Sequence, residues 1–359
     1  MRKGKRSAWV KAILVALVVV FGLLVGRSSV LAAAQELNLL TWCDHTDPKL
    51  LRPFEEKHKV RINMKEYDNT GVALAILEQS QPGDWDVFVV DSIDVERVVK
   101  RGILAPIKKK DFPFDDIFPK IRTPELHTID GKLYAVPEKF GYNCVCYNKE
   151  KVDPADMRDA AMVWNPKYKG RMAVYDYYIP VMEMVAIGLG IKPTEFNAKH
   201  LPAIREKLFL MKEYSVLVGD VVQVQTALAT GEVDVIAGGG EFVVSVLHQE
   251  NPALDWVLPD QGGVRWQQAI GVFAASKKKA LATQFVQYIL SPEGQGHLAT
   301  SACFWAMPAN SKAVLTKEQK KILRWDEQWD FLPNSHFYLQ PDEALDKAML
   351  DVWAEFLQH

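Results

Sequence analysis

Apolar residues along this chain recur in two alternating patterns. Short apolar runs of strand length are followed by longer segments whose apolar residues lie three and four positions apart, as on one face of a helix. The pattern predicts strands at 36–42, 61–67 and 84–92 and helices at 47–60, 71–80 and 94–103. Asp47 and Pro48 suit the N-cap and the first position of the first helix. Strands that alternate with helices in this way indicate an α/β domain with a largely parallel sheet.

A long extended segment at 132–152, broken by Pro137 and Gly141, interrupts this alternation. A second α/β unit follows, with strands expected at 171–176 and 233–238 and helices at 181–190, 201–211 and 221–232. Another long strand at 269–275, helices at 279–290 and 291–300, and a helical tail from about residue 317 complete the pattern.

Two α/β units joined by two long crossover strands predict a two-lobed α/β fold with a cleft between two domains. We expect lobe 1 to comprise 35–140 and about 268–335, and lobe 2 to comprise 141–267 and a C-terminal helix at about 336–359. The crossovers near 140–143 and 267–271 are expected to form the hinge. A chain of this length usually needs more than one hydrophobic core, which agrees with two lobes.

The first 34 residues have the composition of a secretory signal peptide. Five Lys and Arg residues precede an unbroken apolar run at 12–25, and three alanines at 32–34 form a small-residue cleavage site. The apolar run is shorter than the ~20 residues that a membrane-spanning helix needs, and an uncleaved anchor is the alternative. Cleavage at Ala34 or nearby would export a chain of 325 residues to the periplasm.

The charge balance argues against a nucleic-acid partner. The whole chain has 43 Lys and Arg against 45 Asp and Glu, and six of the basic residues lie in the predicted leader. The exported chain would therefore carry 37 basic and 45 acidic residues, a net charge of −8. Such a balance mildly favours cationic or neutral partners.

The four cysteines are Cys43, Cys144, Cys146 and Cys303, which is too few for a disulfide-dense scaffold but allows one bridge in an exported protein. Cys144 and Cys146 would face the same side of a strand and cannot readily pair with each other. A bridge from Cys43 to Cys144 or Cys146 is conceivable, and small buried thiols are the alternative. No CxxC pair and no histidine at ligand spacing indicates a metal site.

Ligands of open α/β sheets bind beyond the carboxyl ends of the strands, so the residues that follow each predicted strand are the candidates for a binding site. They are Trp42, Asp44, His45, Asp91, Ser92, Asp176, Tyr177 and Glu241, together with Trp266 and Gln268 on the second crossover and Trp305 in a late loop. Aromatic faces attract ammonium groups and carboxylates anchor them. This set therefore predicts a site for a small organic cation.

Some of these residues have simpler explanations. Asp44 and Asp91 can cap the helices that follow them, and the glycines at 238–240 can form a tight turn. The N–H groups of these glycines open a helix and, with Arg265 nearby, offer an alternative site for a carboxylate or phosphonate. The chain has no G-x-S-x-G, HExxH, Walker or GxGxxG motif, so we expect neither catalytic residues nor a cofactor.

Seven stretches of the chain also carry a resemblance in their order and spacing. They are LLTWCDHTDPKLLRPFEEKHKVRINMKEYD, DWDVFVVDSIDVERVVKRGILAPI, YAVPEKFGYNCVCYNKEKV, WNPKYKGRMAVYD, ATGEVDVIAGGGEFV, GGVRWQQAIGVFAASKKKALATQFVQYILSPE and AMPAN, within 37–310. Together they resemble the periplasmic solute-binding proteins of ABC importers, and among these the spermidine/putrescine-binding branch. The resemblance implies a type II periplasmic-binding-protein fold that closes on a small-molecule ligand, a monomer without enzymatic activity, and docking on a permease in the inner membrane.

The resemblance carries several aromatic and acidic positions over to this chain. Trp42, Trp266 and Trp305 match aromatic positions of the family's site, and Asp44 matches an acid beside the first of them. His45 stands where the family has a further aromatic residue. The resemblance therefore implies that the aromatic box is retained.

The resemblance also shows which acids are missing. Tyr177 and Pro180 stand at the two second-lobe acids of the polyamine binders, and Gln268 stands at the acid that anchors the central amine. Because an unpaired buried charge costs several kcal/mol, we expect a less charged or zwitterionic amine rather than spermidine or putrescine. The alternatives are polyamine binding itself, a thiaminase-like enzyme that uses Cys43, and ferric-ion binding by Tyr177 and Tyr178.

Overall fold

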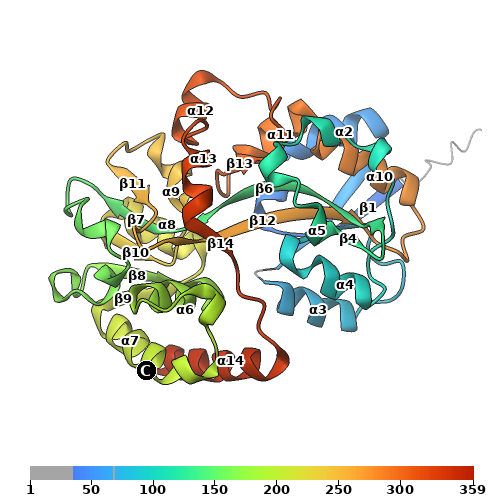
Figure 1. Ribbon diagram of the computed structural model, residues 1–359. Helices are drawn as coiled ribbons and strands as arrows, with labels where there is room; N and C mark the ends of the chain where they lie inside the picture. The colour runs from blue at the N-terminus through green and yellow to red at the C-terminus, as the bar shows by residue number, and fades with distance from the viewer. Residues whose placement is uncertain (1–34, 68) are drawn as a thin grey trace, which may run out of the picture.

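The chain folds into two α/β lobes, as the sequence predicts (Figure 1). The computed structural model describes residues 35–67 and 69–359, so the predicted leader lies outside the described residues. Within these ranges, no helix is both long and apolar enough to cross a membrane. One lobe is built on a seven-stranded sheet and the other on a five-stranded sheet.

The larger sheet has the strand order β13-β6-β12-β3-β1-β2, and β14 extends it beside β12. Its strands are β1 (Gln35–Thr41), β2 (Val60–Glu66), β3 (Val87–Asp91), β6 (Ala135–Asn143), β12 (Gly263–Val272), β13 (Met307–Pro308) and β14 (Ser335–Phe337). β1 pairs in parallel with β2 and β3, whereas β12 runs antiparallel to β3 and β6. Every residue of β3 is buried, which explains its nearly continuous apolar sequence.

Helices of the larger lobe cover this sheet, and a short hairpin lies beside them. The helices are α2 (Pro48–His58), α3 (Thr70–Glu78), α4 (Val95–Lys100), α5 (Pro124–His127), α10 (Lys279–Ile289), α11 (Pro292–Ala299), α12 (Lys317–Ile322) and α13 (Gln328–Phe331), and the hairpin is β4 (Thr128–Ile129) with β5 (Lys132–Leu133). α2 begins where the sequence predicts, because the Asp47 carboxylate accepts a hydrogen bond from the Lys49 N–H at 2.8 Å. It ends at Lys59, whose φ of 53° lies in the left-handed region.

The smaller sheet has the order β11-β7-β10-β8-β9. Its strands are β7 (Val145–Asn148), β8 (Met172–Tyr175), β9 (Ser215–Gly219), β10 (Val235–Ala237) and β11 (Leu254–Val257), and the helices of this lobe are α6 (Tyr178–Gly188), α7 (Leu201–Tyr214), α8 (Val221–Thr230), α9 (Glu241–His248) and α14 (Glu343–Gln358). β9, β11 and β14 were not predicted. β14 (SHF) has no apolar run, so its hydrophobic signal is weak, whereas β9 (SVLVG) has an apolar run of only three residues directly after the long helix α7.

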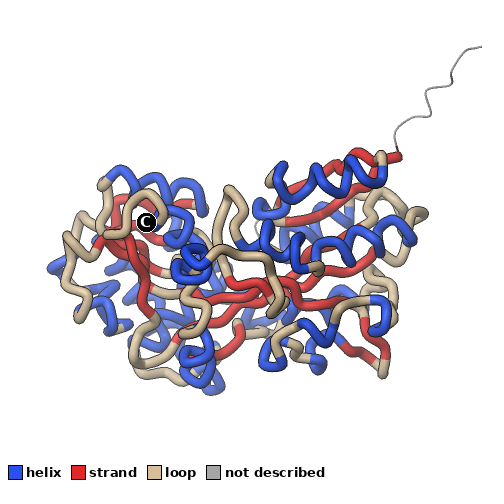
Figure 2. Tube along the Cα trace, turned by 90° about the horizontal axis from the view of Figure 1, so that it is seen from above, coloured by secondary structure: helices blue, strands red, loops and turns tan. Residues whose placement is uncertain are grey.

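Three passages of the chain connect the lobes. Cys144 joins β6 to β7, residues 258–262 join β11 to β12, and a segment after β14 leads to α14, which packs on α7 and α6. Figure 2 shows the strands that run between the two groups of helices. β6 and β12 belong over their whole length to the larger sheet, and the exact division of the chain into lobes and the position of the hinge stay predictions.

Candidate functional site

A cavity of about 1290 Å³ opens between the two lobes. Segments of the larger lobe line one side of it: Trp42 after β1, Tyr67 after β2, the start of α3, and α4. The other side is formed by Tyr175 to Ile179 at the end of β8, by Phe242 of α9, and by α14. The cavity thus lies beyond strand ends of both sheets, where the sequence places the site.

Aromatic rings form a continuous wall of this cavity. Trp266 contacts Phe242 edge-on, with ring centroids 5.6 Å apart, and Phe242 contacts Tyr175 at 6.1 Å. Tyr177 continues the wall to Tyr338, with centroids 5.7 Å apart. On the side of the larger lobe, Trp42 meets Tyr67 at 6.0 Å. A wall of this kind offers ring faces and edges from both lobes to a bound molecule.

Only part of the predicted set lines the cavity. Trp42, Asp176, Tyr177 and Trp266 do so. The remaining residues are buried behind the wall or in the core: Asp44, His45, Asp91, Ser92, Glu241, Gln268 and Trp305. Asp176 also accepts a hydrogen bond from the Trp353 indole of α14 at 2.9 Å, which ties this acid to the last helix.

Asp44 and His45 belong to a fully buried ionic network. The turn at Cys43–Thr46 directs both side chains into the protein, where His45 Nδ1 lies 3.0 Å from Asp44 Oδ1 and His45 Nε2 lies 3.2 Å from Glu138 Oε1. Lys139 Nζ lies 3.1 Å from Asp44 Oδ2 and donates to the carbonyl of Leu298 at 2.9 Å. All four ionisable side chains have no exposed surface. Lys139 lies against the ring of Phe304, which lines the cavity, but none of the four side chains lines the cavity itself.

The protonation states in this network follow from burial and mutual attraction. Burial would raise the pKa of Asp44, but Lys139 and His45 outweigh it and hold that pKa well below its usual range. Burial disfavours a charged His45, yet Glu138 and Asp44 raise its pKa to about 10. Burial also raises the pKa of Glu138 and lowers that of Lys139. The network therefore pairs two acids with two bases, and it holds Asp44 ionised and His45 protonated at neutral pH.

Asp91 and Gln268 lie opposite each other in the larger sheet. Asp91 ends β3 and pairs in register with Gln268 of β12. Asp91 is 1% exposed and Gln268 is 0% exposed, and the polar side-chain atoms of both lack a hydrogen-bond partner. Burial, and then the charge of Asp94, raises the pKa of Asp91 well above its usual value. The neighbouring Ser92 instead shares a hydrogen bond of 2.9 Å with His127.

The carboxylate of Glu241, the residue that follows the glycine turn at 238–240, lies against Gly141 and Tyr142 of β6. It accepts a hydrogen bond from the Tyr142 N–H at 2.8 Å, and Gly141 leaves the room for it, because a Cβ there would stand 1.5 Å from Glu241 Oε1. Arg265 turns away and stacks over the Phe337 ring at 4.0 Å. Neither Arg265 nor the glycines at 238–240 line the cavity, and the anion site stays a prediction. Trp305 is a core residue of the larger lobe, with 6% of its surface exposed.

Burial raises the pKa of Glu241 to about 8, although N–H groups at Tyr142, Glu241 and Phe242 oppose the shift. Between pH ~4.5 and ~8 Glu241 is protonated in the folded state but ionised in the unfolded state. The free energy of unfolding therefore falls by up to about 1.4 kcal/mol per pH unit as the pH rises. We expect Glu241→Gln to remove this decline. Urea unfolding at pH 5.5 and 8.5 measures it, with Glu250→Gln, at an exposed position, as the control. Equal pH slopes for Glu241→Gln and the native protein would contradict it.

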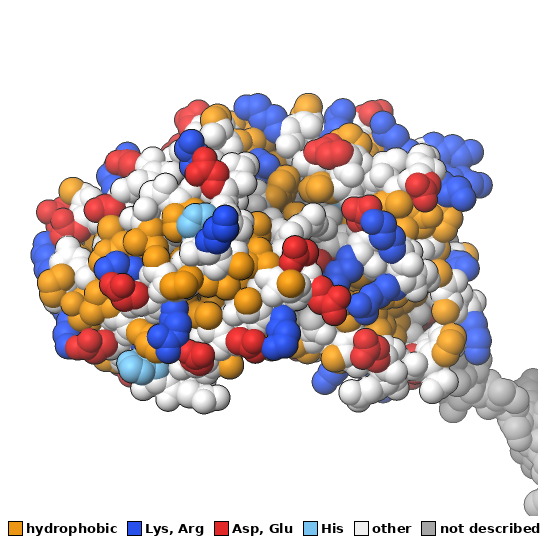
Figure 3. All heavy atoms as spheres, turned by 60° about the horizontal axis from the view of Figure 1, so that its bottom comes forward, with side chains coloured by type: hydrophobic (Ala, Val, Ile, Leu, Met, Phe, Trp, Pro, Cys, Tyr) orange, Lys and Arg blue, Asp and Glu red, His pale blue; other side chains and the backbone are white. Residues whose placement is uncertain are grey.

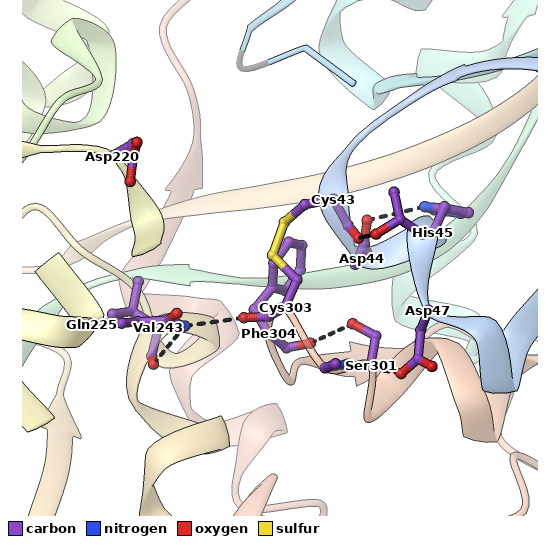
Figure 4. Close-up of a disulfide and its surroundings, with 12 residues drawn as sticks. Cys43, Asp44, His45, Asp47, Asp220, Gln225, Val243, Ser301, Cys303 and Phe304 are labelled. Carbon is purple, nitrogen blue, oxygen red and sulfur yellow. Dashed lines mark hydrogen bonds and ion pairs between the residues drawn. A yellow bond between two sulfur atoms is a disulfide. The ribbon is translucent and has the colours of Figure 1, made fainter. Parts of the chain in front are cut away.

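The disulfide differs from the predicted pairing. Cys43 is bonded to Cys303, and the buried Cys144 and Cys146 are free. A bridge from Cys43 to Cys144 or Cys146 was thus a wrong expectation, because both lie in the core of the smaller lobe beside Ala173 and Ile236. Figure 4 shows the bridge, and Cys43 lines the cavity. In this bond Cys43 has no free thiol, which removes the nucleophile that the thiaminase-like alternative needs.

The bridge fixes a loop that contributes to the cavity. Asp47 accepts a hydrogen bond from the Ala302 N–H at 2.9 Å, and Gln225 of α8 donates to the Cys303 carbonyl at 3.1 Å (Figure 4). The next residue, Phe304, lines the cavity and its ring lies 4.1 Å from Lys139 Nζ. The loop therefore joins the disulfide, the buried network and the smaller lobe.

Sequence reasoning missed several residues of the wall. Tyr67 and Tyr338 directly follow β2 and β14, so the same strand-end rule would have found Tyr67. Tyr338 had no signal, because β14 itself was not predicted. Phe242 and Phe304 lie in a helix and a loop that only the tertiary fold brings together.

The mouth of the cavity is charged on both sides. Arg97, Lys100 and Arg101 line it from α4 and its end, and Glu343 and Asp346 line it from α14. Figure 3 shows the corresponding face, where basic side chains lie interspersed with acidic ones. Tyr178, proposed above for ferric iron, donates its hydroxyl to Asp346 at 2.5 Å. Within 35–67 and 69–359, no cluster of three His, Cys, Asp or Glu residues could hold a metal ion.

Comparisons with known proteins agree with this geometry. Residues 49–324 match the family model described as bacterial extracellular solute-binding protein. The spermidine/putrescine-binding periplasmic protein of Escherichia coli (strain K12) is 24% identical over 261 residues, which are 72% of this chain and 73% of that protein. A putative spermidine/putrescine ABC transporter from Listeria monocytogenes is similar in structure, with a TM-score of 0.79 and 22% identity over 90% of this chain and 99% of that chain. A GABA receptor of solved structure is similar too, with a TM-score of 0.69 and 15% identity over 90% and 97% of the two chains.

Proposed function

Because the chain belongs to the family of bacterial extracellular solute-binding proteins, we propose that it captures a small amine-bearing organic solute for an ABC transporter. The observation that carries this proposal is the aromatic cavity between the lobes, to which both sheets contribute rings. Ring faces attract ammonium groups, by about 2 kcal/mol where water is excluded. Acids at the cavity, such as Asp94 and Asp176, favour the same charge.

Capture would proceed by closure of the lobes. The cavity is open between lobes that three chain passages connect, and its walls come from both of them. A ligand that contacts both walls stabilises the closed arrangement, and the closed surface is what a permease in the inner membrane would recognise. We assign binding and not catalysis to the site, and a monomer without nucleic-acid partners is sufficient for this role.

Export to the periplasm forms part of the proposal. The predicted signal peptide at 1–34 would direct it. The Cys43–Cys303 disulfide supports it, because such bonds persist in oxidising compartments outside the cytoplasm.

Thermal unfolding and calorimetry test the amine class. Butylamine, 4-aminobutyrate, putrescine and spermidine are titrated into the protein beside glucose and phosphate as unrelated solutes, and we expect at least one amine to raise Tm. Trp266→Ala should weaken its binding roughly 10- to 30-fold, as the loss of a buried cation–π contact predicts. The control is Trp325→Ala, since Trp325 packs on Phe118 and does not line the cavity. Stabilisation by glucose or phosphate and by none of the amines would contradict the proposal.

A further inference from the structure

We propose that Asp91 is the ammonium anchor of this site and that it selects solutes with a single ammonium group over polyamines. The inference rests on the solute-binding function proposed above and names the class of its ligand. It was not available from the resemblance, which marks position 268 as the place of an anchoring acid and finds a glutamine there.

The first support is that Asp91 is buried without a hydrogen-bond partner in the ligand-free protein. Both carboxylate oxygens are buried without a hydrogen-bond partner, and so are the amide atoms of Gln268 and the indole nitrogen of Trp266. Buried polar groups are nearly always hydrogen-bonded, and an unpaired one is costly. A cluster of three such side chains on neighbouring strands is expected where another molecule supplies the partner.

The second support is the position of Asp91 relative to the cavity. Its charge acts on the hydroxyls of Tyr67, Tyr177 and Tyr338, whose pKa values burial and then Asp91 raise well above the usual value. These tyrosines follow three different strands and all line the cavity. Asp91 therefore lies behind a wall of phenol rings that come from both lobes. An ammonium group there would meet a carboxylate and aromatic faces together.

The third support is the register between β3 and β12. Gln268 and Asp91 are directly opposite in an antiparallel pair, so their Cβ atoms lie about 4.5–5.5 Å apart on the same face of the sheet. A carboxylate at position 91 thus stands nearly where a carboxylate at position 268 would stand, in the layer behind the wall of the cavity. The neutral Gln268 leaves one acid at this place instead of two.

The remaining charges disfavour a second ammonium group. Asp176 and Asp346 are already hydrogen-bonded to Trp353 and Tyr178, and Asp94 lies 3.9 Å from Arg97. Farther out, α4 contributes basic side chains to the mouth of the cavity. A solute with one ammonium group and a carboxylate or neutral polar end fits this distribution, whereas a fully charged diamine would bring a second cation toward Arg97.

Calorimetry on the full exported chain tests the anchor. Native protein, Asp91→Asn and Asp94→Asn are titrated with 4-aminobutyrate, butylamine, putrescine and spermidine. We expect the native protein to prefer 4-aminobutyrate or butylamine at least 10-fold over the polyamines. Asp91→Asn should weaken that binding at least about 30-fold, as expected for a desolvated charge pair that loses one partner, and Asp94→Asn less than about 5-fold, as for an acid at the rim.

Two further measurements separate an anchor from a structural residue. Asp91→Asn should not lower the Tm of the ligand-free protein, because burial keeps the Asp91 carboxyl protonated there and it has no hydrogen-bond partner to lose. Amine binding at pH 6 should release protons from the native protein and from Asp94→Asn, but not from Asp91→Asn. Tyr67, Tyr177 and Tyr338 stay protonated at that pH, so they add nothing to the release.

The swap of the two side chains completes the test. Gln268→Asp alone should improve putrescine binding relative to butylamine about 10-fold, since it adds a second carboxylate. Asp91→Asn combined with Gln268→Asp should recover butylamine binding. Unchanged butylamine or 4-aminobutyrate affinity in Asp91→Asn, or a native preference for spermidine, would overturn the anchor and leave the amine function standing. A native protein that binds none of the four amines would overturn both.

Discussion

Replacing Lys139 with methionine is expected to lower the free energy of unfolding by about 3–5 kcal/mol, the usual cost of removing one partner from a buried ion pair. The Lys139 ammonium contacts Asp44 at 3.1 Å and donates to the carbonyl of Leu298, and it also lies over the Phe304 ring. Methionine removes one positive charge from the buried network and leaves Asp44 Oδ2 and the Leu298 carbonyl without the ammonium that they contact. Urea denaturation of the two proteins measures the difference.

An exposed lysine provides the matched control. Lys167 forms an ion pair with Asp156 at 2.6 Å, but half of its side chain is exposed, so Lys167→Met should destabilise the protein far less than Lys139→Met. The double variant Lys139→Met with Asp44→Asn should be more stable than Lys139→Met alone, because no charge then remains unpaired. Equal losses for Lys139→Met and Lys167→Met would show that the buried network contributes little.

The sequence predicted the region of the cavity because the hydrophobic pattern indicates where strands end. Trp42, Asp176, Tyr177 and Trp266 follow or lie on predicted strands and line the cavity. Asp44 obeys the same rule but turns inward, because the residues after β1 form a short 3₁₀ turn. The direction of such a turn depends on the buried Lys139 that it meets, which lies far away in the sequence.

The pairing of Asp91 with Gln268 could not be predicted for a similar reason. The register between β3 and β12 joins residues that are distant in the chain, and a shift by one residue would turn each side chain to the other face. The resemblance therefore indicated that Gln268 replaces an acid of the family, but the sequence did not indicate which residue lies opposite Gln268. Asp91 was a candidate as a residue that follows a strand, and not as the partner of Gln268.

Removing the disulfide by Cys43→Ser with Cys303→Ser is expected to lower the free energy of unfolding by about 2–5 kcal/mol. The bridge joins residues that are 260 positions apart, and a bond across so long a loop restricts the unfolded chain strongly. It also fixes the loop that carries Phe304 into the cavity wall. We therefore expect weaker amine binding in the double variant as well as a lower Tm.

Reduction distinguishes the bond from the loss of two sulfur atoms. Dithiothreitol should lower the Tm of the native protein toward that of the double variant and leave the variant unchanged. Cys144→Ala removes a buried cysteine that is not bonded, so its Tm should still respond to the reductant as the native Tm does. A native protein whose Tm is insensitive to complete reduction, verified by thiol counting, would contradict a stabilising role for the bond. Because the bridge lies at the cavity, amine affinity should fall on reduction in parallel with Tm.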